Sequence, residues 1–253
     1  MLIYRYRTSA NYHIEALLNN QINGSLYSQF KDVGELNLSI SDEAWIDAGF
    51  PLGSKQPLLD SIINHIRSSF YMACFTKVSP VEKESASFWK QYANNGTGFC
   101  VEYRTEDIQR AIQGAPPEFT RGLKEVIYSS EPNDLTDFFI ALSKALVSVQ
   151  EKNHQTMTEA LYSQDKDIGH KVTQSLMWKS SEYYREREVR LTALCNNTSG
   201  PVPPIHRNDL LCVRPSRVFV SKRMNVLDQG RIFSCCNANR IVALTIDPSH
   251  LVA

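Results

Sequence analysis

The sequence predicts a single α+β domain over residues 1–253, with a helical insertion at about 131–184 between two groups of strands. Strand-like apolar runs occur near both ends of the chain, whereas helical periodicity dominates the middle. No internal repeat, low-complexity segment or long linker divides the chain, and its only proline-rich stretch, 200–204, is short enough to be a loop. These observations favour one continuous core over two separate domains.

The first half of the chain alternates predicted strands and helices. Residues 2–6 predict a strand that places Tyr4 and Tyr6 on one face and Arg5 and Arg7 on the other. A helix should begin at about Asn11, and the Asn23-Gly24 turn should lead into a short strand at about 25–28. Apolar residues at intervals of three and four after Pro57 predict an amphipathic helix. Further strands are expected at 70–75, 98–103 and 125–128.

The middle of the chain has the periodicity of long helices. From Leu135 to about Tyr162 an apolar stripe continues without glycine or proline, and Asn133 or Asp134 is a suitable N-cap. The stripe consists of Phe138, Phe139, Leu142, Leu146 and Val149. A second helix should run from about Ile168 towards Tyr184. Strands are then expected at 189–194, 210–213, 218–220 and 241–246.

Composition narrows the class of protein. Lys and Arg number 27 and Asp and Glu also 27, so the net charge is zero, which is unusual for a protein that coats DNA. Only 11 glycines and 11 prolines, together with 25 aromatic residues, exclude a disordered or collagen-like chain. No apolar stretch is long enough to span a membrane and the N-terminus has no apolar signal core, so we expect a cytoplasmic protein without a membrane partner.

The cysteines and histidines do not suggest a metal site. None of the six cysteines forms a C-x-x-C pair, and several lie in apolar runs, so we expect buried reduced thiols and no bound metal. The six histidines are scattered without metal-ligand spacing. The glycine-rich phosphate-binding loops, the zinc-protease motif and the nucleophile elbow of hydrolases are also absent from the sequence.

Four local features carry residue types that occur in active sites. They are the segments Tyr4-Arg5-Tyr6-Arg7, Cys74-Phe75-Thr76, the aromatic and glycine-rich stretch 88–103, and Glu186-Arg187-Glu188-Val189-Arg190. Alternation along a strand would bring Glu186, Glu188 and Arg190 to one face. Three of these features also have an ordinary structural interpretation: solvent-facing arginines on an edge strand, core aromatics, and a solvated ladder of ion pairs.

Taken in this order, the four features resemble a widespread bacterial family of unknown function. Members begin with a Y-[KR]-Y-R strand and continue with F-x-D-P-x-E, C-F-[ST], W-x-x-Y-[AG] and G-x-C-[IV]-x-[FY] segments, then a lysine before E-x-E-x-R. The counterparts here are Tyr4–Arg7, Phe30–Glu35, Cys74–Thr76, Trp89–Ala93, Phe99–Tyr103 after Gly98, and Lys179 with Glu186–Arg190. Val33 replaces the usual proline, and Tyr183 stands where a tryptophan is common. The resemblance spans roughly residues 2–194 and implies no established activity.

The same arrangement is similar to that of NAD-consuming ADP-ribosyltransferases. That resemblance implies a split, mainly antiparallel β core, with an arginine on the first strand, a serine or threonine at a strand end, and a late glutamate. Arg5 or Arg7 would match the first element, Thr76 or Ser28 the second, and Glu186 with Glu188 the third.

The residue types suit this chemistry. Cleavage of the nicotinamide–ribose bond creates positive charge at the anomeric carbon, which a carboxylate stabilises. In the site that this resemblance implies, Glu188 would be the main catalytic residue, Glu186 would orient or activate the acceptor, and Arg190 would hold Glu188. Arg5 and Arg7 would bind the pyrophosphate of NAD, Thr76 the ribose, and Tyr4, Tyr6 or Tyr92 would flank nicotinamide.

The sequence leaves three functional hypotheses open. The first is an NAD-dependent transferase or glycohydrolase, such as a toxin or anti-phage effector, whose acceptor is a protein side chain, a nucleic acid or water. The second is a non-catalytic sensor or partner-binding protein, with the helices at 135–184 as its docking face. The third is a metal-independent nuclease that uses Arg5, Arg7, Glu188 and a histidine, against which the neutral net charge counts.

Overall fold

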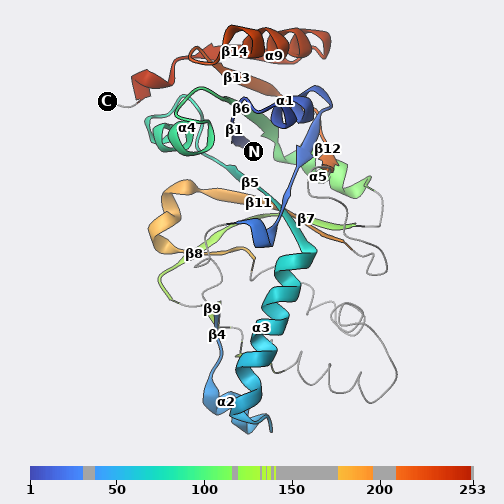
Figure 1. Ribbon diagram of the computed structural model, residues 1–253, viewed down its shortest axis with the longest axis vertical. Helices are drawn as coiled ribbons and strands as arrows, with labels where there is room; N and C mark the ends of the chain where they lie inside the picture. Colours follow the sequence, from blue (N-terminus) through green and yellow to red (C-terminus); the bar gives the residue numbers. More distant parts are fainter. Residues whose placement is uncertain are drawn as a thin grey trace.

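An eight-stranded sheet organises the protein, in the strand order β14-β13-β6-β1-β5-β11-β7, with β3 beside β5 (Figure 1). The computed structural model describes residues 1–30, 38–115, 119–131, 133–134, 136–137, 140, 176–195 and 209–251. Neighbouring strands are antiparallel except for β13 and β14, so the sheet is mainly antiparallel, as predicted. Its strands are β1 (Leu2–Arg7), β3 (Ser25–Leu26), β5 (Phe70–Thr76), β6 (Phe99–Arg104), β7 (Phe119–Glu125), β11 (Glu188–Cys195), β13 (Arg217–Ser221) and β14 (Val242–Ile246).

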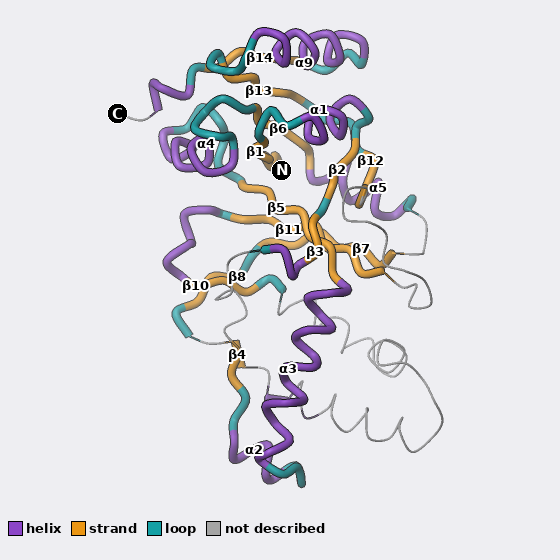
Figure 2. The backbone as a smooth tube through the Cα atoms, in the orientation of Figure 1, coloured by secondary structure: helices purple, strands orange, loops and turns teal. Residues whose placement is uncertain are grey.

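The sheet consists of two halves that meet at a single residue pair. β1 pairs with β6 along its whole length, from Leu2 opposite Arg104 to Arg7 opposite Phe99. On its other side β1 pairs with β5 only where Tyr4 lies opposite Thr76. β5 in turn pairs with β11 along its whole length. β1 and β5 therefore diverge beyond this single contact (Figure 2).

Helices cover both faces of the sheet. On one face, α1 (Asn11–Leu18), α5 (Thr105–Gln113) and α9 (Val226–Ala238) contribute Ile14, Ile108 and Ile232, all fully buried, to the larger core cluster. On the other face, α4 (Ala86–Tyr92) packs Phe88 and Trp89 against the tyrosines of β1. The two faces follow from the alternation along β1, where Ile3 belongs to the first cluster and Tyr4 to the second.

The remaining elements extend from this core. α3 (Leu52–Ser69) projects away from the sheet and leads directly into β5, and α2 (Asp42–Asp47) packs at its outer end (Figure 1). Three small ladders pair β2 (Gln21–Asn23) with β12 (Asp209–Cys212), β8 (Ile127–Ser129) with β10 (Trp178–Ser180), and β4 (Leu38–Ser39) with β9 (Asn133–Asp134). Short 3₁₀ helices occur as η1 (Tyr27–Gln29), η3 (Lys83–Ser85), η4 (Ser181–Glu186) and η6 (Pro248–Leu251).

Several sequence predictions need correction. The helix expected after Pro57 begins earlier, at Leu52. A proline near the start of a helix removes only one backbone donor, so it does not prevent the helix from beginning before it. Ser28 lies in η1 and not in a strand. The helix predicted to continue to Tyr184 is wrong over its last part, since β10 and η4 occupy this segment. There, pairing of β10 with β8 outweighs local helical propensity.

Part of the predicted helical insertion falls outside the described residues. This holds for Leu135, for the apolar stripe from Phe138 to Val149, and for the segment 141–175 as a whole. The predicted strand at 125–128 is divided at Val126, because β7 pairs with β11 whereas β8 pairs with β10. No helix in the described part of the chain is both long and apolar enough to cross a membrane.

Candidate functional site

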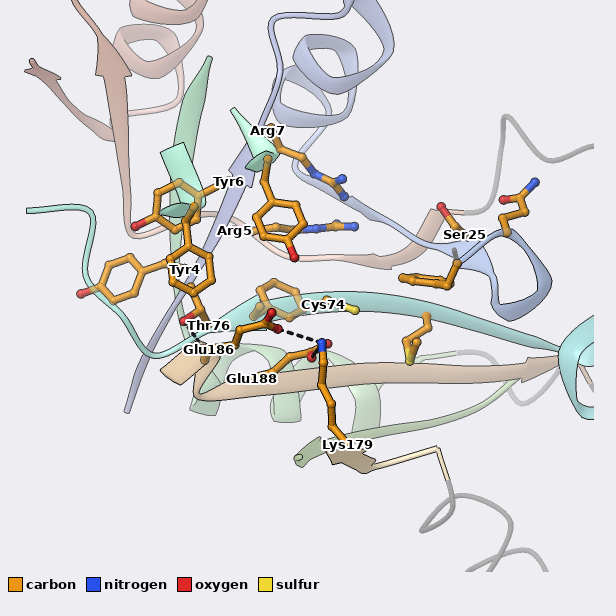
Figure 3. A pocket seen from close by; sticks show the side chains of 16 residues that line it. Tyr4, Arg5, Tyr6, Arg7, Ser25, Cys74, Thr76, Lys179, Glu186 and Glu188 are labelled. Carbon is orange, nitrogen blue, oxygen red and sulfur yellow. Dashed lines mark hydrogen bonds and ion pairs between the residues drawn. The ribbon is translucent and has the colours of Figure 1, made fainter. Parts of the chain in front are cut away.

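A pocket of about 360 Å³ lies where β1 and β5 diverge, a volume in the range of small-molecule sites. The four residues Tyr4–Arg7 line it from β1, and Met72 and Cys74–Thr76 line it from β5. Lys179, Glu186 and Glu188 close a third side. In Figure 3, Arg5 and Arg7 extend above the β5 ribbon, whereas Lys179, Glu186 and Glu188 gather on its other side. The divergence of the two strands thus brings Arg5 and Glu188 to one site.

The backbone between η4 and β11 brings the two carboxylates to the same pocket. Arg187, which separates them, has a left-handed backbone with φ of 44°, so Glu186 is not part of the strand as predicted. The end of β5 fixes this turn: the Thr76 hydroxyl donates to the Glu186 carbonyl at 2.6 Å, and the Lys77 amide donates to the Arg187 carbonyl at 3.1 Å. Thr76 therefore positions the carboxylate segment from the neighbouring strand.

A buried ion-pair network holds the carboxylates. Arg190 donates to both oxygens of Glu188, from Nε at 2.9 Å and from Nη2 at 3.2 Å. Lys179 Nζ bridges the two acids, at 2.8 Å from Glu186 Oε2 and 3.3 Å from Glu188 Oε2. The side chains of Lys179, Glu188 and Arg190 are 4%, 7% and 1% exposed, while that of Glu186 is 22% exposed. A solvated ladder of ion pairs is therefore the wrong interpretation of this motif.

The network keeps Glu188 ionised. Burial by itself would raise the pKa of the Glu188 carboxyl, but the charge and hydrogen bonds of Arg190, then Lys179 and the Cys74 thiol, outweigh it. The pKa of Glu188 is therefore lower than that of a free glutamate. A carboxylate that is held by two cations is a poor base, and its fixed negative charge is suited to stabilising a developing cation.

Arg5 and Arg7 form the opposite wall of the pocket. Arg5 is 9% exposed, lies over the ring of Phe75 at 5.5 Å and donates from Nη2 to the Asn23 carbonyl at 2.5 Å. Arg7 donates more weakly to the same carbonyl, at 3.4 Å. No carboxylate in the described ranges pairs with either guanidinium. The interpretation as solvent-facing arginines on an edge strand is wrong, because β1 lies between β6 and β5.

The His13 ring contacts the Arg7 guanidinium. Its Nε2 lies 3.4 Å from Arg7 Nη1, and its Nδ1 lies 3.0 Å from the Thr8 hydroxyl. Burial, together with the nearby Arg7 charge, lowers the pKa of His13 to about 3, so the ring is neutral at pH 7. A neutral ring that donates from Nδ1 to Thr8 leaves Nε2 free to accept from Arg7. Burial lowers the pKa of Arg7 to about 10, which still leaves the guanidinium charged at neutral pH.

Aromatic side chains form the remaining wall. Tyr6 stacks on Phe88 with ring centroids 5.4 Å apart and meets Trp89 edge-on at 5.2 Å. Tyr92, at the end of α4, lines the pocket and is 45% exposed. Burial and the neighbouring Glu186 raise the pKa of Tyr92. Phe88 therefore belongs to the core and also lines the pocket, whereas Trp89 belongs to the core alone and Tyr92 to the pocket alone.

Seven of the eight predicted site residues line this one pocket: Arg5, Tyr6, Arg7, Thr76, Tyr92, Glu186 and Glu188. Ser28 does not line it; its side chain is exposed, and Ser25 lies at the pocket instead. Sequence reasoning assigned no role to Lys179, although this lysine belongs to the motif that precedes Glu186–Arg190. The signal available was a lone lysine in an otherwise apolar segment, Leu176-Met177-Trp178.

No metal centre is found in the described ranges, where no group of three or more His, Cys, Asp or Glu side chains is arranged to hold an ion. The described cysteines Cys74, Cys100, Cys212, Cys235 and Cys236 are free thiols.

Comparison with known proteins identifies a family for the central part of the chain. Residues 88–191 match the family described as protein of unknown function (DUF2971). Over these residues the match confirms the resemblance to an uncharacterised family. The DUF2971 match contains β6, Lys179 and the Glu186–Arg190 segment, whereas β1 lies outside it. No curated protein and no solved structure matches the chain.

Proposed function

We propose that this protein is an NAD-consuming enzyme, an ADP-ribosyltransferase or glycohydrolase. One observation carries the proposal: a single pocket, where two strands of the sheet diverge, has two arginines on one wall and two carboxylates on the opposite wall. Neither arginine has a carboxylate partner among the described residues. Three cations and two carboxylates line it, which leaves one net positive charge for an anionic ligand. Guanidinium groups bind phosphates through paired hydrogen bonds, so Arg5 and Arg7 suit a pyrophosphate.

The reaction would separate ribose from nicotinamide. The C1′–N bond breaks, its electron pair leaves with the neutral nicotinamide, and positive charge develops at C1′ and the ring oxygen. The fixed negative charge of Glu188 would stabilise this cation, as preorganised charges do in other transition states. An acceptor oxygen or nitrogen then forms the new bond to C1′ and loses its proton. When water is the acceptor, the product is ADP-ribose.

Glu186 is the better candidate to take that proton. Its side chain is 22% exposed, whereas that of Glu188 is 7% exposed and is held by two bonds from Arg190. Thr76 fixes the Glu186 backbone and lies at the pocket, where it supports the placement of both carboxylates. In this proposal Glu188 supplies the fixed negative charge, and Glu186 is the base that an acceptor can reach.

Nicotinamide release from NAD by the purified protein tests this proposal. Glu186→Gln should lower the release rate by about 10²–10⁴-fold, the usual loss for a general base. Arg5→Lys keeps a charge but loses the fork geometry and should raise KM more than it lowers kcat. Glu182→Gln, on the exposed side of the same 3₁₀ helix, is the matched control and should change neither.

The proposal fails if the folded wild-type protein releases no nicotinamide with water, protein or nucleic acid as acceptor, and if NAD does not raise its melting temperature. A release rate that Glu186→Gln and Glu182→Gln lower equally would also contradict the assignment of roles.

A further inference from the structure

A second cavity, separate from the pocket between β1 and β5, is surrounded by arginines. It is a groove of about 620 Å³ between α5 and the connection from β12 to β13. Four guanidinium groups line it, from Arg104, Arg110, Arg214 and Arg240. None of its lining residues also lines the first pocket, and Arg104 lies opposite Leu2, at the far end of β1 from Arg7. We call it the arginine groove.

The four arginines come from four separate segments. Arg104 ends β6, Arg110 lies on α5, Arg214 follows β12, and Arg240 follows α9. Arg240 has a left-handed backbone with φ of 54°, a conformation in which glycine or asparagine is usual at the end of a helix. Arg214 Nη2 donates to the Arg240 carbonyl at 2.6 Å, which ties two sides of the groove together. The fold therefore gathers these charges although the sequence does not.

The charges of the arginine groove are poorly neutralised by the protein. Asp107 is the one carboxylate among the lining residues, and it accepts from Arg110 Nη1 at 3.3 Å. Within the described ranges, no carboxylate pairs with Arg104, Arg214 or Arg240. Four cations and one carboxylate leave three net positive charges at one groove, in a chain whose overall charge is zero. Like charges held together repel, and a ligand with several negative charges relieves that repulsion.

We propose that the arginine groove binds the phosphate backbone of a nucleic-acid duplex. Several guanidinium groups at separate positions suit a ligand whose phosphates repeat along a line. The groove has no aromatic side chain among its lining residues, so it lacks the stacking platform on which proteins bind single-stranded bases. Recognition would therefore be independent of base sequence and sensitive to salt.

Neutral overall charge does not contradict this assignment. Phosphate binding depends on the local field within about 10 Å at ordinary ionic strength, because salt screens more distant charges. The inference does not rest on the proposed NAD chemistry, because duplex binding is measured without NAD.

Fluorescence anisotropy of a labelled 20-base-pair duplex, as DNA and as RNA, tests the proposal in a salt series. Contact with three phosphates predicts a slope of about −2.7 in log affinity against log salt, or roughly a 40-fold loss between 50 and 200 mM. The triple variant R104Q/R214Q/R240Q should lose most of the affinity and have a slope near zero. The control K83Q/K90Q/K222Q removes the same charge from exposed positions elsewhere and should retain the wild-type slope.

Two further measurements distinguish duplex binding from binding of other ligands and from binding at the first pocket. ATP and a labelled single strand of the same length are compared with the duplex, and Glu186→Gln tests independence from the first pocket. We expect the duplex to bind most tightly and Glu186→Gln to bind it like the wild type. The proposal is overturned if the triple variant and the control bind equally, if neither duplex binds, or if ATP or the single strand binds better than the duplex. Melting temperatures of all variants establish that loss of binding is not loss of fold.

Discussion

Replacing Glu188 by glutamine should destabilise the protein far more than the same change at Glu186. Glu188→Gln keeps the side-chain shape but removes the carboxylate that the Arg190 guanidinium, 1% exposed, contacts at 2.9 and 3.2 Å. Removing one partner of a buried ion pair costs about 3–5 kcal/mol of unfolding free energy, because the other charge remains buried. At about 2–4 °C per kcal/mol for a chain of this size, the melting temperature should fall by roughly 6–20 °C.

Glu186→Gln should cost less than about 1 kcal/mol. Its side chain is 22% exposed, and Lys179 keeps Glu188 as a partner after the change. Urea denaturation of wild type, Glu186→Gln and Glu188→Gln measures both effects, with the exposed Glu182→Gln as control. Equal losses for the two glutamates, or a loss below about 1 kcal/mol for Glu188→Gln, would refute the view that the network is buried and mutually dependent.

The same network provides a stricter test through coupling. The double variant Glu188→Gln with Arg190→Met removes both charges, and its cost should be smaller than the two single costs added together by about 1–3 kcal/mol. Additive costs would show that the two side chains do not depend on each other. This measurement also decides how activity data are interpreted, since an inactive Glu188→Gln protein is informative only where it is folded.

Three further substitutions test the scaffold of the fold. The pKa of His13 is about 3 in the folded state, whereas a histidine in the unfolded chain has a pKa near 6.5, so below pH 6.5 the unfolded chain binds one more proton. The free energy of unfolding should therefore fall by about 1–3 kcal/mol from pH 6.5 to 4.5. His13→Gln should flatten this part of the pH profile. Gly98→Ala should lower the melting temperature by several degrees, because the new Cβ would lie 2.0 Å from the Arg7 carbonyl oxygen. Gly230→Ala lies in α9 with open space around it, and should raise the free energy of unfolding by about 0.5–1 kcal/mol. Urea denaturation at several pH values and thermal melting check these expectations; a pH profile that His13→Gln leaves unchanged, or equal effects at the two glycines, would contradict them.

Much of the sheet could be predicted because its strands have local signals. The alternation in residues 2–6 and the apolar run 70–75 correspond to β1 and β5, both of which have side chains buried on each face. The helices α4, α5 and α9 were not predicted. α4 and α5 have only seven and nine residues, so their apolar periodicity repeats over too few turns to stand out in the sequence.

Strand alternation predicts the positions of Glu188 and Arg190 but not that of Glu186. Placing Glu188 and Arg190 on one face needs only a strand, which exists from Glu188 onwards. Glu186 reaches the same pocket for a different reason, because the left-handed Arg187 turns the chain and Thr76 holds the Glu186 carbonyl. The predicted convergence is therefore correct for Glu186, although the strand geometry assumed for it is wrong.

Lys179 shows most clearly what a pattern in the sequence cannot supply. It lies seven residues before Glu186 and nine before Glu188, at no spacing that suggests contact, and it reaches both acids because β10 pairs with β8 beside β11. Its ammonium group allows two carboxylates to stay ionised close together, which otherwise raises the pKa of one of them. Lys179 thus offsets the repulsion between the two carboxylates, which the proposed division between a fixed charge and a base requires.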